Sequence, residues 1–131
     1  MKSRDSLVRL KRFQAEEKRR RVAQIEAMIA EFSRMVADLD REIAAEEQRS
    51  GIADAAHFAY STYARAARTR RDNLAQSANE LRQQLEEARA ALDEALEDVA
   101  RAQSLEGREK GGERAGDLRD MESAGLRAAG A

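Results

Sequence analysis

The chain has 131 residues, enough for one domain, but only 4% of them are aromatic and 37% are charged, which leaves too few large apolar side chains for a single round core. It contains no cysteine, so disulfides, thiolate metal sites and cysteine nucleophiles are excluded, and this fits a cytosolic protein. The net charge of −1 hides charged blocks: residues 1–21 hold nine basic and three acidic side chains, whereas residues 72–106 hold three and nine. No apolar run predicts a signal peptide or a membrane-spanning helix.

A first helix is predicted from about Asp5 to Arg49. Apolar residues recur in it every three or four positions, which is the spacing of a coiled-coil seam, because it keeps one narrow apolar stripe facing a partner helix. Ser50 and Gly51 mark its end, since glycine commonly follows the C-terminus of a helix. The seam consists of Val22, Ile25, Ile29, Phe32, Val36, Leu39 and Ile43.

A second helix is predicted from about Ala55 to Leu105, with Asp54 as its N-cap. Proline is absent, so nothing interrupts either helix, and a turn over residues 50–54 is short enough to make them antiparallel neighbours. We therefore predict an all-α fold in which residues 1–106 form an antiparallel coiled-coil hairpin of two long helices. The second seam consists of Leu74, Ala78, Leu81, Leu85, Ala88, Leu92, Ala95 and Val99.

The charge blocks predict a register for this hairpin. A turn centred near Ile52 puts the basic residues 1–21 beside residues 83–103, which belong to the most acidic stretch. Opposite charges beside an apolar seam are what fixes orientation and register in coiled coils. The same register brings Asp38, Asp40 and Glu42 opposite the segment that contains Arg65 and Arg68.

The last segment, residues 107–131, differs from the rest. It holds six of the seven glycines in a polar stretch that cannot pack, and it is predicted to be disordered. Gly107 and Gly112 have the glycine spacing of a phosphate-binding loop. However, Glu113 and Arg114 stand where lysine and serine or threonine are needed, so we interpret the match as chance.

No catalytic, cofactor or metal site is predicted. His57 is the only histidine, and without cysteine it cannot form a transition-metal site on its own. Carboxylates on a two-helix rod stay solvated, whereas acid–base catalysis needs them buried or crowded in a cleft. We therefore expect a protein that contacts other proteins rather than an enzyme.

Three groups of residues are candidates for partner binding. An apolar stripe near the start is out of phase with the seam, so part of it should face outward. A basic group is either neutralised by the second helix or meets an acidic protein; Phe13 is the only aromatic residue near it, so we expect no nucleic acid. An aromatic group at the tip either caps the seam against Leu39 and Ile43 or docks a partner. The groups are Leu7, Leu10 and Phe13; Arg19, Arg20 and Arg21; and Phe58, Tyr60 and Tyr63.

Two regions of the chain resemble a known family. The opening segment, residues 2–14 (KSRDSLVRLKRFQ) with residues 17–20 (EKRR) after it, resembles the start of the flagellar export protein FliJ in its alphaproteobacterial form. The tip segment, residues 51–60 (GIADAAHFAY), and residues 70–74 (RRDNL) fit the same form. The resemblance covers about residues 1–106 and does not extend into the tail.

The resemblance implies a function. FliJ-type proteins are non-enzymatic stalks or adaptors of the flagellar type III export apparatus, which link the hexameric export ATPase, the cytoplasmic domain of the membrane export gate and the export chaperones. It implies a cytoplasmic protein without cofactors, monomeric when free, held by its partners at the inner membrane below the flagellum. The end where the helix termini meet is expected to enter the ATPase ring, and the tip or a helix face is expected to meet the gate or chaperones.

Two alternatives remain open on the residues alone. One is a generic coiled-coil scaffold, including a dimeric one, without a role in export. The other is a nucleic-acid or membrane-surface binder that uses the basic N-terminal block, and it predicts an affinity that falls steeply with salt.

Overall fold

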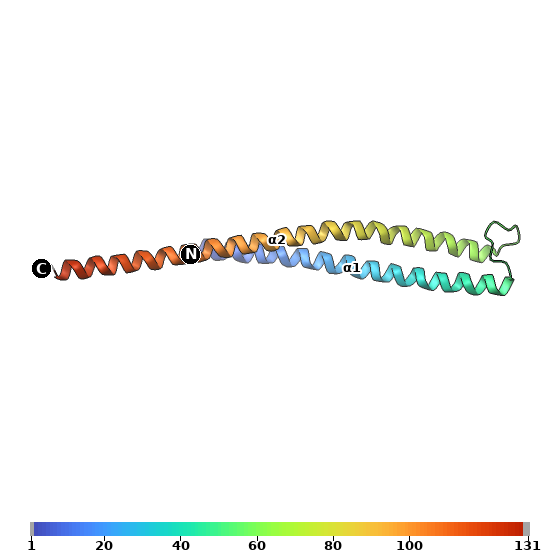
Figure 1. Cartoon of the computed structure of the whole chain (residues 1–131), viewed down its shortest axis with the longest axis horizontal. Coiled ribbons are helices and arrows are strands. Elements are labelled where there is room, and N and C mark those ends of the chain that lie inside the picture. The colour runs from blue at the N-terminus through green and yellow to red at the C-terminus, as the bar shows by residue number, and fades with distance from the viewer. Residues whose placement is uncertain (1, 130–131) are drawn as a thin grey trace. The chain divides into compact units, whose positions relative to one another are not determined.

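A computed structural model describes the backbone of residues 2–129 and the side chains of residues 3, 5–108, 111, 112 and 116. It contains two helices, α1 (Lys2–Ser50) and α2 (Thr62–Ala129), joined by a loop over residues 51–61 (Figure 1). Among the described residues there is no strand. The predicted all-α helical hairpin is confirmed.

The chain divides into two compact units, each containing part of both helices. Residues 19–90 form one unit, and residues 1–18 with residues 91–131 form the other, called the terminal unit below. In the 19–90 unit the helices run antiparallel, and a cluster of Leu39, Ile43 and Ala67 packs with Leu74 between them. Its apolar stripe is narrow, as the seam spacing predicts.

The seam residues of the 19–90 unit lie between its helices. Ile25 is the most deeply buried large side chain, with 1% of its surface exposed. Ile29, Phe32 and Val36 are half-buried, as expected where only two helices meet. The buried positions of this unit are Val22, Ile25, Leu39, Ile43, Tyr60, Ala64, Ala67, Ala78, Leu81 and Leu85.

The predicted end of α1 is close to the observed one. Gly51 has a φ of +75°, the left-handed conformation that glycine adopts without steric cost, and its amide donates to the Glu47 carbonyl at 2.9 Å. The last helical residue is Ser50, one position beyond the predicted Arg49.

The predicted start of the second helix is wrong by seven residues. Asp54 does accept an amide hydrogen bond, from Ala56 at 2.9 Å, but this bond closes a turn within the loop. The N-cap of α2 is Ser61, whose Oγ accepts from the Ala64 amide at 3.2 Å. The turn predicted over residues 50–54 is therefore a loop over residues 51–61.

The C-terminal end also differs from the prediction. α2 was expected to end near Leu105, yet it continues through the segment predicted to be disordered as far as Ala129. A Cβ added at Gly107, Gly111, Gly112 or Gly116 would have nothing within 4 Å, so no packing contact explains the helix at these positions. Alanine, leucine, arginine and glutamate between the glycines, and the absence of proline, favour helix there.

The register differs from the prediction by one heptad. Residue 40 was expected to face residue 64, whereas the Asp40 carboxylate meets the Arg71 guanidinium at 3.1 Å. The acidic residues expected opposite Arg65 and Arg68 have other partners: Asp38 pairs with Arg41 of its own helix, Glu42 accepts from Tyr63, and Arg68 meets Glu47. A displacement of seven residues returns every seam position to a seam position, so the apolar pattern cannot distinguish the two registers.

In the terminal unit, the buried positions of α1 continue the four-three spacing of the seam that begins at Val22. Val8 and Ala15 of α1 are buried, and so are Ala95 and Ala102 of α2. Leu92 and Val99 are half-buried. These mostly small side chains bury little apolar area, so this pairing is weaker than that of the 19–90 unit.

Candidate protein-interaction sites

The loop over residues 51–61, called the tip loop, is built from consecutive turns. The His57 amide donates to the Asp54 carbonyl at 3.0 Å, and the Tyr60 amide donates to the His57 carbonyl at 3.1 Å. The His57 Nδ1 accepts from the Ala59 amide at 3.0 Å, which fixes the imidazole ring against the loop. The loop thus has a defined conformation, without proline and with a single glycine.

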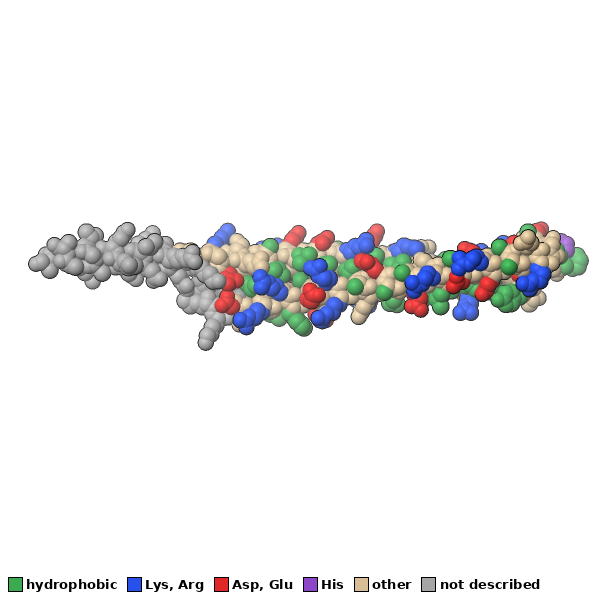
Figure 2. Space-filling model, turned by 90° about the horizontal axis from the view of Figure 1, so that it is seen from below, with side chains coloured by type: hydrophobic (Ala, Val, Ile, Leu, Met, Phe, Trp, Pro, Cys, Tyr) green, Lys and Arg blue, Asp and Glu red, His purple; other side chains and the backbone are tan. Residues whose placement is uncertain are grey.

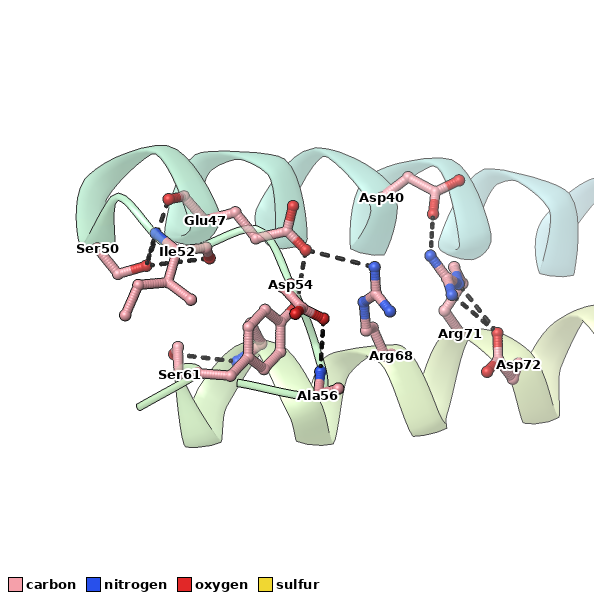
Figure 3. Close-up of polar contacts among 12 residues, drawn as sticks. Asp40, Glu47, Ser50, Ile52, Asp54, Ala56, Ser61, Arg68, Arg71 and Asp72 are labelled. Carbon is pink, nitrogen blue, oxygen red and sulfur yellow. Dashed lines mark hydrogen bonds and ion pairs between the residues drawn. The ribbon is translucent and has the colours of Figure 1, made fainter. Parts of the chain in front are cut away.

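A group of polar contacts, called the neck clasp, joins the base of the tip loop to the end of α1 (Figure 3). The Tyr60 hydroxyl donates to Glu47 Oε1 at 2.7 Å, and Arg68 lies 3.5 Å from the same oxygen. The Ser61 hydroxyl donates to Glu46 at 3.1 Å. Glu47 is the centre of the clasp, because one of its oxygens serves both Tyr60 of the loop and Arg68 of α2.

The ring of Tyr60 lies close to two arginine side chains. It is 5% exposed, and the guanidinium carbons of Arg65 and Arg68 lie 5.5 and 5.6 Å from its centroid, within the range of cation–π attraction. Burial, followed by the hydrogen bond to Glu47, raises the pKa of Tyr60 above its ordinary value. Tyr60 therefore anchors the loop rather than presenting a free surface.

The predicted aromatic group at the tip separates into three different environments. Tyr60 is buried, whereas Tyr63 is 59% exposed and donates to Glu42 at 3.1 Å, a bond that raises the pKa of Tyr63. Phe58 is 94% exposed and stacks on the His57 ring, with centroids 4.7 Å apart and ring planes inclined by 22°. Of this group, Phe58 is the side chain presented to solvent on an ordered loop.

The apolar stripe near the start of α1 faces mostly outward, as its phase predicts. Leu10 is 50% and Phe13 61% exposed, while Leu7 is half-buried. The basic residues Arg19, Arg20 and Arg21 are exposed. Arg19 and Arg20 have interaction partners within the chain.

On the face drawn in Figure 2, charged side chains of the two signs are mixed. Figure 2 shows basic, acidic and hydrophobic side chains interspersed over the described part of one face. Surface grooves occur in the 19–90 unit, one lined by Glu42, Glu46, Arg49 and Tyr63 and another by Val36, Ala75, Ala78 and Arg82. The side chains around them are mostly solvated and bring no acid–base pair into a closed site.

The part of the chain that the structure describes contains neither a cluster of metal ligands nor a helix that could span a membrane. No cluster of three or more potential ligands from histidine, cysteine, aspartate and glutamate occurs among those residues. Neither helix contains, within the described residues, a stretch long and apolar enough to cross a membrane.

Comparison with known proteins gives no relative. No family model, curated protein or solved structure matches the chain.

Proposed function

We propose that the chain is a non-catalytic stalk or adaptor of the flagellar type III export apparatus, which links the export ATPase ring, the membrane export gate and export chaperones. In this proposal it works in the cytoplasm and is held at the inner membrane through its protein partners. The family named is the one that residues 2–14 and 51–60 resemble.

One observation carries the proposal. The two most exposed large apolar side chains among the described residues, Phe58 and Phe13, lie within the two segments that resemble FliJ proteins. A coiled-coil seam accounts for buried apolar residues in any hairpin, but it does not account for exposed ones. Exposed aromatic side chains on an ordered backbone are typical anchors of protein–protein contacts, because little conformational freedom is lost when they bind.

The face drawn in Figure 2 also favours proteins over nucleic acid as partners. Binding to nucleic acid rests on a field of one sign along the phosphate backbone. The face in Figure 2 mixes both signs over its described part, and Arg19 and Arg20 already have partners within the chain.

The test is a binding measurement with purified components. The chain is titrated against the export ATPase and against the cytoplasmic domain of the export gate from the same cell. Phe58→Ala and a Leu10→Ala/Phe13→Ala double variant are compared with Met28→Ala, which removes an exposed side chain outside both segments. We expect a substitution in one of the two segments to weaken the binding of one partner at least tenfold. Met28→Ala should change the affinity for neither partner.

Binding to neither partner would contradict the proposal, as would normal motility in a strain that lacks the gene. Sedimentation of the free chain distinguishes the proposed adaptor from the main alternative, a generic coiled-coil scaffold. A stable dimer without affinity for either partner would indicate the scaffold. A variant that binds weakly counts as evidence only if circular dichroism shows that its helix content is unchanged, because an unfolded variant would also lose binding.

A further inference from the structure

We infer that the 19–90 unit is a two-register hairpin: α2 can pair with α1 in a second register, displaced by one heptad away from the tip, with the tip loop supplying the extra helix. In the observed register residue 40 meets residue 71, and in the second it meets residue 64. At 1.5 Å per residue, the displacement is about 10 Å along the helices. The inference concerns the fold and does not depend on the proposed function.

The seams permit the displacement because both keep the four-three spacing, with Arg71 as the one charged position of the α2 seam between Tyr60 and Leu85. On α1 the four-three spacing runs from Val22 to Ile43, and on α2 it runs back from Leu85 through Leu74 to Tyr60. A displacement by seven residues therefore keeps apolar positions opposite each other in the unit, except at Arg71. Alanines occupy several α2 positions, including Ala64, Ala67 and Ala78, so few large side chains must repack.

The tip loop holds the residues that the second register needs. It has eleven residues, Gly51–Ser61, whereas two antiparallel helices need a connection of about two to five. Asp54 already accepts from the Ala56 amide, as an N-cap would, and the His57 amide already bonds back to the Asp54 carbonyl. Residues 55–61 (AAHFAYS) contain neither proline nor glycine, so they can extend α2 by two turns with Asp54 as the cap.

The neck clasp selects the observed register. The second register separates Glu47 from Arg68, and it replaces Ser61 by Asp54 as the N-cap. It also ends the contact between Asp40 and Arg71. These polar contacts are what distinguishes the registers, because the apolar seam does not.

The clasp is incomplete, which keeps the difference between the registers small. The Arg68 Nε is buried and has no hydrogen-bond partner among the described atoms, and an unpaired buried donor is destabilising. The distance from Arg68 to Glu47 is 3.5 Å, at the long limit of a hydrogen bond. A partner that contacts the tip loop or the clasp can therefore shift the balance, provided that it binds the two registers with different affinity.

Engineered disulfides test the inference, since the chain has no cysteine of its own. Ala75 and Val36 line the same groove, so Val36→Cys with Ala75→Cys reports the observed register. Ile29 lies seven residues before Val36 and faces Ala75 in the second register. Ile29→Cys with Ala75→Cys therefore reports that register. Ala27→Cys with Ala75→Cys is the matched control, because Ala27 is exposed and lies midway between the seam positions Ile25 and Ile29.

Oxidation in a glutathione buffer is followed by mass spectrometry, with intramolecular bonds counted in the monomer fraction. We expect the 36–75 bond to dominate and the 29–75 bond to form faster than the 27–75 control. Glu47→Gln, which weakens the clasp, is expected to raise the ratio of 29–75 to 36–75 bonds by about tenfold, the order expected for hydrogen bonds to a charged group.

The inference is overturned if the 29–75 bond forms no faster than the control in either background. It is also overturned if the 29–75 bond forms only with loss of helix content, because that result indicates collisions in unfolded chains. The 27–75 control measured in the Glu47→Gln chain separates a change of register from a general loss of stability.

Discussion

The Arg71 guanidinium lies 3.1 Å from the Asp40 carboxylate across the two helices, although Arg71 occupies a seam position of α2 between Ala67 and Leu74. Its side chain is 27% exposed, and the hydrogen bond to Asp40, followed by that to Asp72, raises the pKa of Arg71. A charge at this position fixes the register but removes an apolar side chain from the seam. This is the familiar exchange of stability for specificity in coiled coils.

We predict that Arg71→Leu stabilises the chain by about 1 kcal/mol, because a partly exposed ion pair contributes little and a leucine completes the seam. Urea unfolding followed by circular dichroism measures the change. Arg70→Leu is the control, since Arg70 is exposed and its replacement should shift the free energy of unfolding by less than about 0.5 kcal/mol. A clear loss of stability in Arg71→Leu alone would show that the ion pair outweighs the seam.

The fold class was predictable from the sequence because one pattern determines it. A four-three repeat over seven positions of α1 is typical of a helix that packs lengthwise against a partner helix, and Gly51 marks the end of that helix. The phase of the seam also predicted that part of the Leu7, Leu10 and Phe13 stripe faces outward. The same spacing, followed back from Leu74 to Tyr60, would have revealed the full length of the second seam.

The register and the tip loop were not predictable on the same basis. Asp54 and Ser61 are both good N-cap residues, and they lie seven positions apart, so each is consistent with one of two equivalent registers. What selects Ser61 is a set of tertiary contacts, chiefly from Tyr60 and Arg68 to Glu47. Such contacts between distant polar side chains leave no periodic signal.

Stability at high pH should depend on Tyr60. Burial and the Glu47 carboxylate raise the pKa of Tyr60 in the folded chain above the value of about 10 that it has when unfolded. The stabilising contribution of Tyr60 is therefore complete below pH 10 and is lost as the pH rises through the folded-state pKa. We expect urea midpoints to fall between pH 9 and pH 11 in the wild-type chain and to fall less in Tyr60→Phe.

Tyr63→Phe is the comparison for this experiment. The bond to Glu42 raises the pKa of Tyr63 as well, but Tyr63 is 59% exposed, so water screens the effect. We expect its pH dependence to stay close to that of the wild-type chain. If the urea midpoint falls equally with pH in Tyr60→Phe and in the wild-type chain, the neck clasp does not persist in solution.

Ile25 should contribute most to the stability of the 19–90 unit. It is 1% exposed, and truncating a buried isoleucine costs the lost transfer free energy plus a cavity. We expect Ile25→Ala to lower the free energy of unfolding by about 2 kcal/mol, the low end of the usual range, because a two-helix interface can close around the gap. Met28→Ala removes a side chain that is 42% exposed and should cost less than about 0.5 kcal/mol. Similar costs for both variants would place the seam elsewhere on α1.

The glycines of the C-terminal part of α2 provide a direct test of the helix there. A Cβ at Gly111 or Gly112 would meet nothing within 4 Å, and alanine favours helix over glycine by about 1 kcal/mol per residue. We expect the Gly111→Ala/Gly112→Ala double variant to increase the ellipticity at 222 nm without moving the urea midpoint, because these positions contact nothing. Gly51→Ala is the opposite control: its φ of +75° makes any side chain strained, so it should lower the midpoint without a gain in ellipticity. If the ellipticity of both the wild-type chain and the double variant corresponds to helix that ends near residue 106, residues 107–116 are not helical in solution, and the disorder predicted from their composition holds.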